Sequence, residues 1–245
     1  MATYKCQAII IKRHNFGEAD RLLTLLSDKF GKIKVIAKGV RKPLSKLGGH
    51  LELFYLTEFL LAEGKNLDTV CGAQIIESYP NLRKNLSLTQ KAFYFAELID
   101  KLLQEELENK EIFEMFRNSL KLLDHESNSL LLRYFELQLL SQLGHHPEVE
   151  HCVKCREKLN PDKIFWSNEL GGALCENCRT HSEVFLEVST DAIKIIRLFL
   201  TQKIEAVNKL KVEKKMEKEL ENIIDGFLRY VSEKEFNSKK YVREK

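Results

Sequence analysis

Four of the six cysteines in the chain form two closely spaced pairs. Two residues separate Cys152 from Cys155, two separate Cys175 from Cys178, and nineteen residues lie between the pairs. A two-residue spacer lets both sulfurs of a tight turn face one ion, and four thiolates complete the tetrahedron that zinc prefers. Because such a shell leaves no open coordination position, the spacing predicts one structural Zn²⁺ ion bound by Cys152, Cys155, Cys175 and Cys178.

Two alternative roles for these cysteines stay open. They could form a pair of redox motifs, or they could be four unrelated thiols, although a reducing compartment disfavours disulfides. The surrounding segment 151–180 is short and carries few apolar side chains, so we expect it to gain its stability from the metal. Cys6 and Cys71 stand apart from the pairs, and we interpret both as core residues.

The basic residues are concentrated in one window, although the net charge of the whole chain is only +3. Residues 29–46 hold seven lysines and arginines and no acidic residue. A local surplus of this kind indicates a polyanionic partner. Lys12, Arg13 and Arg21 would widen the basic patch, unless acidic residues close by in the sequence neutralise them.

The first eighty residues show the alternation of side chains that is typical of β-strands. We expect five short strands, with a non-strand insert at 39–50 between the third and the fourth. This arrangement favours a small closed barrel of the oligonucleotide-binding (OB) type. The predicted strands cover residues 4–11, 21–27, 31–38, 51–62 and 68–79.

The third predicted strand places Lys32, Lys34 and Lys38 on one face and an apolar row on the other. Lysines on the outer face of a barrel strand suit contact with the phosphate backbone of a nucleic acid. The alternative is an edge strand that uses its lysines only to resist aggregation. The same charge continues into the insert through Arg41, Lys42 and Lys46.

After Pro80 the apolar period changes from two to about three and a half residues, which indicates helices. The third of these is apolar on most sides and is therefore expected inside a bundle. The predicted helices cover residues 92–103, 112–123, 130–143, 191–202 and 213–231. The predicted fold class is α+β: a five-stranded OB-fold barrel over 1–80, then an all-helical domain over 81–245 with the tetracysteine zinc module, 151–180, inserted in it.

The sequence lacks the signatures of common enzyme classes. It contains no GxxxxGK[ST], GxGxxG, HExxH or GxSxG motif, so we predict a binding protein without catalytic residues or a small-molecule substrate. The longest stretch without a charged residue is 137–147, shorter than the ~20 residues of a membrane-spanning helix. We therefore expect a cytoplasmic protein with no membrane partner.

Five segments of the chain together resemble one protein family. They are GEADRL at 17–22, GKIKVIAKGVRKPLSKLGG at 31–49, LDTV at 67–70, LGHHPEVEHCVKC at 143–155 and GGALCENC at 171–178. Their order and spacing resemble the bacterial RecO family of DNA repair and recombination mediators, over essentially the whole chain. One position, Arg156, departs from the family, in which a glycine often follows the second cysteine.

The resemblance implies an OB barrel, a helical domain and a zinc module set within that domain. It also implies binding to single- and double-stranded DNA, strand annealing, association with RecR, and loading of RecA onto DNA coated with single-strand-binding protein, whose acidic C-terminal tail would meet the helical domain. The family acts in the RecF pathway, at the nucleoid, without nucleotide-driven catalysis. Carried over by position, the metal ligands are the four paired cysteines, and the DNA contacts are Lys32, Lys34, Lys38, Arg41, Lys42 and Lys46.

Two rival functions stay open from the residues alone. A zinc-ribbon RNA-binding factor would share the barrel, the basic face and the four cysteines. A metal-dependent nuclease would need a carboxylate cluster or an open zinc position, and the sequence indicates neither.

Overall fold

The computed structural model describes residues 2–125, 128–161, 163–179 and 185–242 of the chain. The chain divides into two compact units. Unit one comprises residues 1–126 together with 236–245, and unit two comprises residues 127–235.

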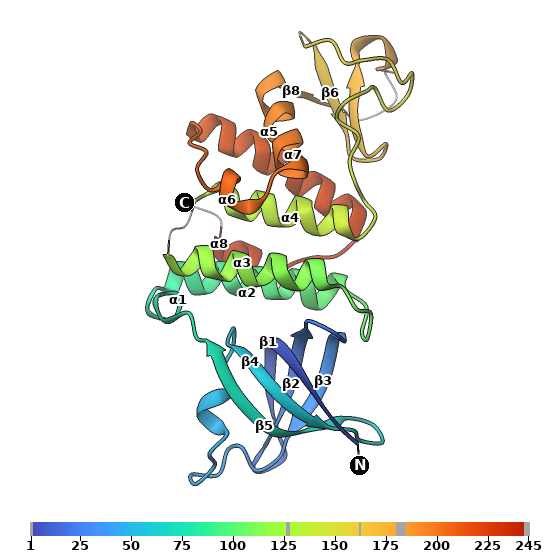
Figure 1. Ribbon diagram of the computed structural model, residues 1–245. Helices are drawn as coiled ribbons and strands as arrows, with labels where there is room; N and C mark the ends of the chain where they lie inside the picture. Colours follow the sequence, from blue (N-terminus) through green and yellow to red (C-terminus); the bar gives the residue numbers. More distant parts are fainter. Residues whose placement is uncertain (1, 126–127, 162, 180–184, 243–245) are drawn as a thin grey trace. The chain divides into compact units, whose positions relative to one another are not determined.

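Unit one contains the closed barrel that the alternation predicts (Figure 1). The strand order is β1-β2-β3-β5-β4, and β4 pairs with β1 to close the ring. The β3–β5 pair is parallel, and the other pairs are antiparallel. The strands are β1 (Thr3–Phe16), β2 (Asp20–Ser27), β3 (Gly31–Ala37), β4 (Leu56–Ala62) and β5 (Asp68–Glu77). The prediction of an N-terminal five-stranded OB-type barrel is therefore confirmed.

The barrel closes around side chains from alternate positions of its strands. Ala8, Ile10, Leu23, Leu25 and Val35 are fully buried in this core. Burying one side chain of the size of leucine or isoleucine contributes about 1.5–3 kcal/mol. The apolar row predicted for the third strand thus faces the interior. Cys6 is buried in this core as predicted, whereas Cys71 on β5 is exposed, so its interpretation as a core residue is wrong.

The first strand runs further than its sequence pattern predicts. β1 extends to Phe16, and its register with β2 shifts between Ile10 and Lys12. Such a bulge exchanges the two faces of the strand. The alternation of apolar and polar residues therefore breaks after Ile11, although the strand continues.

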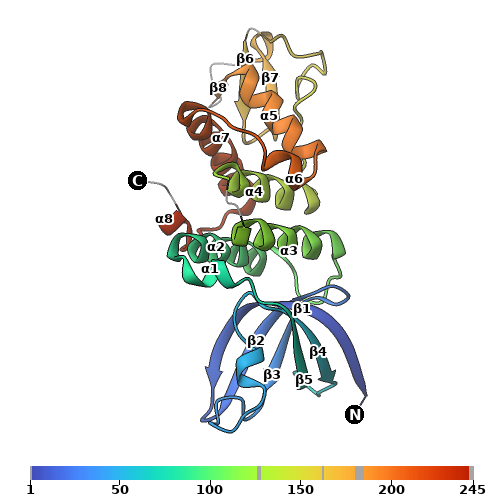
Figure 2. The same cartoon turned by 60° about the vertical axis from the view of Figure 1, so that its left-hand side comes forward.

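Helices α1 (Pro80–Lys84), α2 (Leu86–Leu102) and α3 (Lys110–His125) lie against the barrel in both views (Figures 1 and 2). The side chain of Asn85 caps α2 by accepting hydrogen bonds from the backbone N–H groups of Ser87 and Leu88. The helix thus begins at Leu86, ahead of the apolar stripe that predicts it from residue 92 onward. The predicted domain boundary between residues 80 and 81 stays a prediction, and these helices belong to the same compact unit as the barrel.

The C-terminal part of unit one folds back on α2. It contains the short helix α8 (Lys239–Val242), which contacts α2. The Glu97 carboxylate accepts hydrogen bonds from the backbone N–H groups of Asn237, at 2.9 Å, and Ser238, at 2.8 Å. Burial opposes the ionisation of Glu97, but these bonds and one from Lys101 lower its pKa to about 2. Glu97 is therefore ionised when it binds the backbone of Asn237 and Ser238.

Unit two is built around α4 (Leu130–Gln142), which is buried on most of its surface as its sequence predicts. It contacts α5 (Thr190–Thr201), α6 (Ile204–Val207) and α7 (Lys214–Ser232). The hydroxyl of Ser189 caps α5 by accepting a hydrogen bond from the backbone N–H of Ala192. The Arg133 guanidinium pairs with the fully buried Glu136 carboxylate at 3.0 Å inside the bundle.

A small sheet in the order β7-β6-β8 completes unit two (Figure 2). Its strands are β6 (Ile164–Ser167), β7 (Gly172–Cys175) and β8 (Leu186–Val188). The Trp166 ring packs edge-on against Phe227 of α7, with ring centroids 5.7 Å apart, and joins the sheet to the helices. None of the helices in the described ranges is both long enough and apolar enough to cross a membrane.

Candidate metal centre and nucleic-acid interface

The four paired cysteines meet at one point of unit two. Their sulfur atoms all lie within 4.8 Å of one another, and the sulfurs of Cys155 and Cys175 are 3.8 Å apart. None of these cysteines forms a disulfide. The two closely spaced pairs therefore form a single cluster that is tight enough to hold one metal ion.

Backbone hydrogen bonds place the two pairs beside each other. The N–H of Val153 donates to the carbonyl of Ala173 at 2.9 Å, and the N–H of Ala173 donates to the carbonyl of Glu148 at 2.8 Å. A side chain at Gly172 would put its Cβ 2.2 Å from the Glu148 oxygen. The GGALCENC segment therefore needs glycine there, because the backbones approach too closely for any other residue.

Arg156 follows the second cysteine with a φ of 64°. This left-handed conformation favours glycine, since a Cβ atom then crowds the following carbonyl. Its N–H donates to the carbonyl of Cys152 at 2.9 Å and closes the turn that carries the first cysteine pair. The turn is thus the same one that a glycine would form, and arginine occupies it under strain.

The cluster favours deprotonated sulfur at its buried corner. Burial raises the pKa of the Cys152 thiol, but backbone N–H groups of Cys155, Cys175 and Lys154 outweigh burial and lower it to about 6. Hydrogen bonding to the Cys155 sulfur, followed by burial, raises the pKa of Cys178 to about 12. Four neighbouring thiolates repel one another, so a cation at their centre would stabilise the fully deprotonated set.

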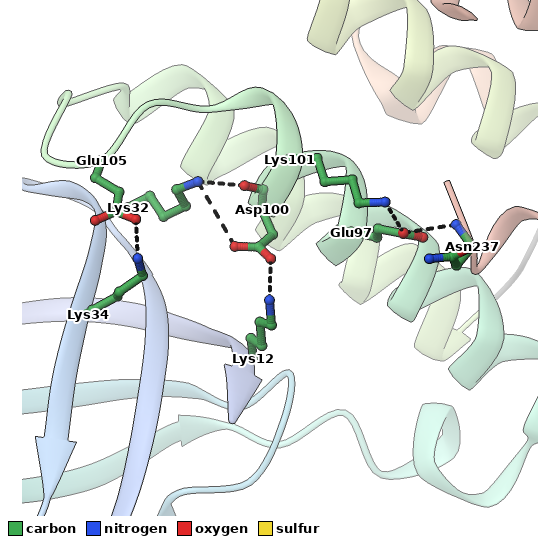
Figure 3. A network of polar contacts seen from close by, with 8 residues as sticks. All are labelled: Lys12, Lys32, Lys34, Glu97, Asp100, Lys101, Glu105 and Asn237. Carbon is green, nitrogen blue, oxygen red and sulfur yellow. Dashed lines mark hydrogen bonds and ion pairs between the residues drawn. The ribbon is translucent and has the colours of Figure 1, made fainter. Parts of the chain in front are cut away.

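Two of the six predicted DNA contacts lie on β3, where α2 and the loop after it cover part of the barrel (Figure 3). Lys32 is only 5% exposed, and its ammonium donates to the carbonyl of Asp100 at 2.5 Å. Lys34 is exposed and pairs with the Glu105 carboxylate. Lys32 and Lys34 therefore lie on the same face of β3, as predicted, but Lys32 is buried and does not face solvent. DNA contacts at Lys32 and Lys34 stay predictions, and the ion pairs with Asp100 and Glu105 make both side chains less available to DNA.

The other predicted contacts lie in the loop after β3, and we call residues 38–46 the basic insert. Lys38, Lys42 and Lys46 are exposed, and in the described part of the chain no carboxylate lies within 4.0 Å of their ammonium groups. These side chains are therefore available to an anionic ligand, and their contact with DNA stays a prediction.

The GEADRL segment fastens the basic insert to the loop between β1 and β2. The N–H of Gly39 donates to the Asp20 carboxylate at 2.7 Å, and the N–H of Arg41 donates to the carbonyl of Ala19 at 2.8 Å. The Arg41 guanidinium also donates to the carbonyls of Gly17 and Glu18 in this loop. Hydrogen bonds thus hold the basic insert next to the loop between β1 and β2.

Lys12, Arg13 and Arg21, which would widen the basic patch unless nearby acidic residues neutralise them, each pair with a residue that is distant in the sequence. The Lys12 ammonium lies 2.9 Å from the Asp100 carboxylate (Figure 3). Arg13 and Arg21 both pair with Glu52 instead of the nearby acidic residues. Partners so far apart in the sequence leave no local signal of the pairing.

The fold and the cysteine cluster define a protein that joins an OB-type barrel to a helical region with four cysteines close enough to hold a metal ion. Comparison with known families narrows this class. The model "Recombination protein O N terminal" matches residues 1–79, and the model "Recombination protein O C terminal" matches residues 83–240. The chain therefore belongs to the RecO family, as the five sequence segments predict.

Individual relatives agree with this assignment. The DNA repair protein RecO of a Dehalococcoides mccartyi strain is 40% identical over 233 residues, which cover 95% of this chain and 92% of the relative. The protein of the same name from Roseiflexus is 36% identical over 95% of this chain and 82% of its own length. The one from Pelotomaculum thermopropionicum is 33% identical over 97% and 93%.

Proposed function

We propose that this protein is a recombination mediator in DNA repair. It binds single- and double-stranded DNA, anneals complementary strands and, together with RecR, helps to load RecA onto DNA coated with single-strand-binding protein. The observation that carries the proposal is the similarity, over nearly the whole chain, to relatives named DNA repair protein RecO. Such a protein would work at the nucleoid, in the cytoplasm.

The basic insert is the part of the barrel best suited to hold DNA. OB folds bind oligonucleotides with loops such as the one between β1 and β2, to which this insert is fastened. Phe16, 54% exposed at the end of β1, offers an aromatic face on which a base can stack. Contacts with phosphates make binding tolerant of sequence and strongly dependent on salt. Lys32 and Lys34 would contribute only if their ion pairs opened.

Neutralising the charge of two strands on one surface accounts for annealing without a catalytic step. We propose no enzymatic activity and no small-molecule substrate. The acidic tail of single-strand-binding protein is the expected partner of the helical region, by family resemblance.

The cysteine cluster fits a structural zinc ion. Four sulfurs bound to zinc at about 2.3 Å lie about 3.8 Å from one another, and the Cys155 and Cys175 sulfurs are separated by 3.8 Å. Because all four donors are sulfurs, the ion would have no open position for a substrate. Its role would be to hold together the segment that carries Cys152, Cys155, Cys175 and Cys178.

An annealing assay tests the proposal directly. Complementary strands coated with single-strand-binding protein are mixed with the wild-type protein and with a variant that carries Lys38→Glu, Lys42→Glu and Lys46→Glu. We expect the wild type to accelerate annealing and the variant to lose most of this effect, with an unchanged melting temperature. Failure of the wild type to anneal or bind DNA would refute the proposal.

The same material separates the rival functions. Competition between RNA and single-stranded DNA identifies an RNA-binding factor if RNA binds more tightly. Incubation of labelled DNA with Mg²⁺ or Mn²⁺ identifies a nuclease if the DNA is cleaved.

A further inference from the structure

Three arginines from separate elements of unit one surround one glutamate. A nitrogen of Arg13 in β1 lies 2.6 Å from the Glu52 carboxylate, one of Arg21 in β2 lies 3.6 Å from it, and one of Arg83 in α1 lies 3.8 Å from it. We call these four residues the arginine cluster. It carries three positive charges and one negative charge, a surplus of +2.

The cluster lies at the margin of the barrel core, where water only partly screens its charge. The strand registers place Arg13 opposite Leu23 and Arg21 opposite Ala37, and both of these partners are buried core residues. The arginine side chains are 31%, 22% and 34% exposed, and that of Glu52 is 29% exposed. A surplus of like charge is costly in such surroundings unless an anion offsets it.

The acceptors within the protein do not match the donors. In the ranges that the structure describes, Glu52 is the one carboxylate within 4.0 Å of these three guanidinium groups. Nη1 of Arg13, the atom 2.6 Å from Glu52, and Nε of Arg21 are shielded from solvent and make no hydrogen bond of good geometry. Two carboxylate oxygens cannot satisfy three guanidinium groups with five N–H donors each, so the N–H groups on the exposed part of these side chains are the donors that a ligand can reach.

The surrounding residues hold Arg83 in a fixed position. Its guanidinium donates to the carbonyl of Leu53 at 3.2 Å and lies 4.0 Å above the centre of the Tyr55 ring. Arginine stacked in this way loses little freedom when it binds a planar or tetrahedral anion. The cluster is thus arranged before any ligand arrives.

We infer that the arginine cluster binds a phosphate group of a nucleic-acid strand. A phosphate offers acceptor oxygens that match the fork of a guanidinium group, and phosphate contacts position a strand without reading its sequence. Glu52 competes with the phosphate for the same donors and moderates the affinity. The inference rests on the proposed DNA binding and adds a site outside the six predicted contacts.

The location of the arginine cluster suits a nucleic-acid strand that also contacts the basic insert. Glu52 belongs to the segment between β3 and β4 that contains the insert. Arg21 directly follows Asp20, whose carboxylate fastens Gly39 at the start of the insert. One strand would then meet flexible lysines in the insert and fixed arginines in the cluster.

A purely structural role, in which the cluster only joins α1 to the barrel, predicts a different response to mutation. In that case Glu52→Gln would lower the melting temperature and leave DNA affinity unchanged. In a phosphate site, Glu52→Gln removes the competing anion and raises the affinity. The sign of this one change therefore distinguishes a phosphate site from a structural brace.

The test measures binding of a labelled single strand of about 20 nucleotides over a range of salt concentrations, by fluorescence anisotropy on the full chain. Arg21→Gln and Arg83→Gln should each weaken binding about tenfold and reduce the salt slope by about 0.7. Glu52→Gln should strengthen binding about threefold. Lys5→Gln removes one positive charge from an exposed ion pair with Glu58 on the same barrel and serves as the control, with little change expected.

Melting temperatures accompany every variant. If Arg21→Gln unfolds the barrel, Arg21→Lys, which keeps the charge and loses the fork, should fold and bind with intermediate affinity. Wild-type affinity in this lysine variant, or no gain in Glu52→Gln, overturns the inference.

Two further outcomes separate this inference from the proposed function. In the first outcome, the wild type binds the DNA strand, the variant with three substitutions in the basic insert does not, and Arg21→Gln and Arg83→Gln bind normally. The arginine cluster is then not a DNA site, while the proposed function stands. If the wild type does not bind the strand, the proposed function fails as well. Pyrophosphate that raises the melting temperature of the wild type but does not compete with the strand would identify a free phosphate compound as the ligand and overturn the strand assignment.

Discussion

The barrel of unit one and the cysteine-containing sheet of unit two are both small β structures, but different forces hold them together. The barrel encloses a continuous apolar core with fully buried residues on its strands, such as Leu25 and Phe59. The sheet has three short strands and, beside it, four thiols gathered within 4.8 Å. Apolar burial can therefore sustain the barrel alone, whereas we expect the cysteine segment to depend also on a cation.

The largest test of this contrast removes the metal. In a Cys152→Ser, Cys175→Ser variant, we expect zinc content to fall from about one ion per chain to none, with loss of structure around the cysteines. Structural zinc contributes roughly 10–16 kcal/mol of apparent binding free energy in small zinc-dependent domains. Metal analysis and thermal melting measure the effect. Cys71→Ser, at an exposed cysteine of the barrel, is the control, and loss of its zinc would contradict the ligand assignment.

The converse test damages the barrel core. Phe59 is fully buried, and Phe59→Ala should lower the free energy of unfolding of unit one by about 3–5 kcal/mol through lost burial and a cavity. Denaturant titration measures the loss, while zinc content should not change. Phe30→Ala, at a ring that is 38% exposed, should cost much less. A drop in zinc content in Phe59→Ala would show that the two units do not fold separately.

Acid should affect the two units at different pH values. The pKa of Glu97 is about 2, below its ordinary value of 4.5, so its stabilising effect is present above about pH 4.5 and is lost as pH falls toward 2. Metal binding needs deprotonated sulfur and weakens in milder acid. Zinc release should therefore precede melting of unit one in a pH series. Glu97→Gln should flatten the dependence of unit-one stability in this range; an unchanged slope would contradict the assignment.

The smallest expected effect concerns Arg156. Because its φ of 64° suits glycine, Arg156→Gly should stabilise the cysteine-containing unit by up to about 1 kcal/mol. The exposed ion pair with Glu148, at 3.7 Å, contributes little. Thermal melting of the zinc-loaded protein measures the gain. Glu157→Gly, at a position without positive φ, should instead be neutral or destabilising, and an equal gain there would show that backbone strain at Arg156 is not the cause.

Local patterns in the sequence predict the cysteine cluster, the barrel and most helices. The two-residue spacing of Cys152 and Cys155 reflects one tight turn, and a strand's alternation reflects its two faces. Such features depend on neighbours along the chain. They can therefore be predicted without knowledge of the tertiary structure.

Features that depend on distant partners escape such reasoning. Lys32 belongs to a basic window, yet it is buried because Asp100 reaches it from another element. Arg21 has acidic neighbours in sequence, yet it pairs with Glu52. The continuation of β1 beyond Ile11 cannot be predicted from the alternation of side chains, because a bulge interrupts that alternation and no residue type marks the bulge.

The way the barrel closes limits how other chains can join it. The ring is closed, but β3 and β5 pair only at Val35 with Asp68 and at Ile36 with Thr69, so most of β5 has β4 as its single strand neighbour in the described ranges. In the small sheet, the order β7-β6-β8 leaves β7 and β8 with one strand neighbour each. A partner that extends a sheet would therefore pair with β5 in the barrel or with β7 or β8 in unit two, while any other partner of the barrel must recognise its side chains and loops.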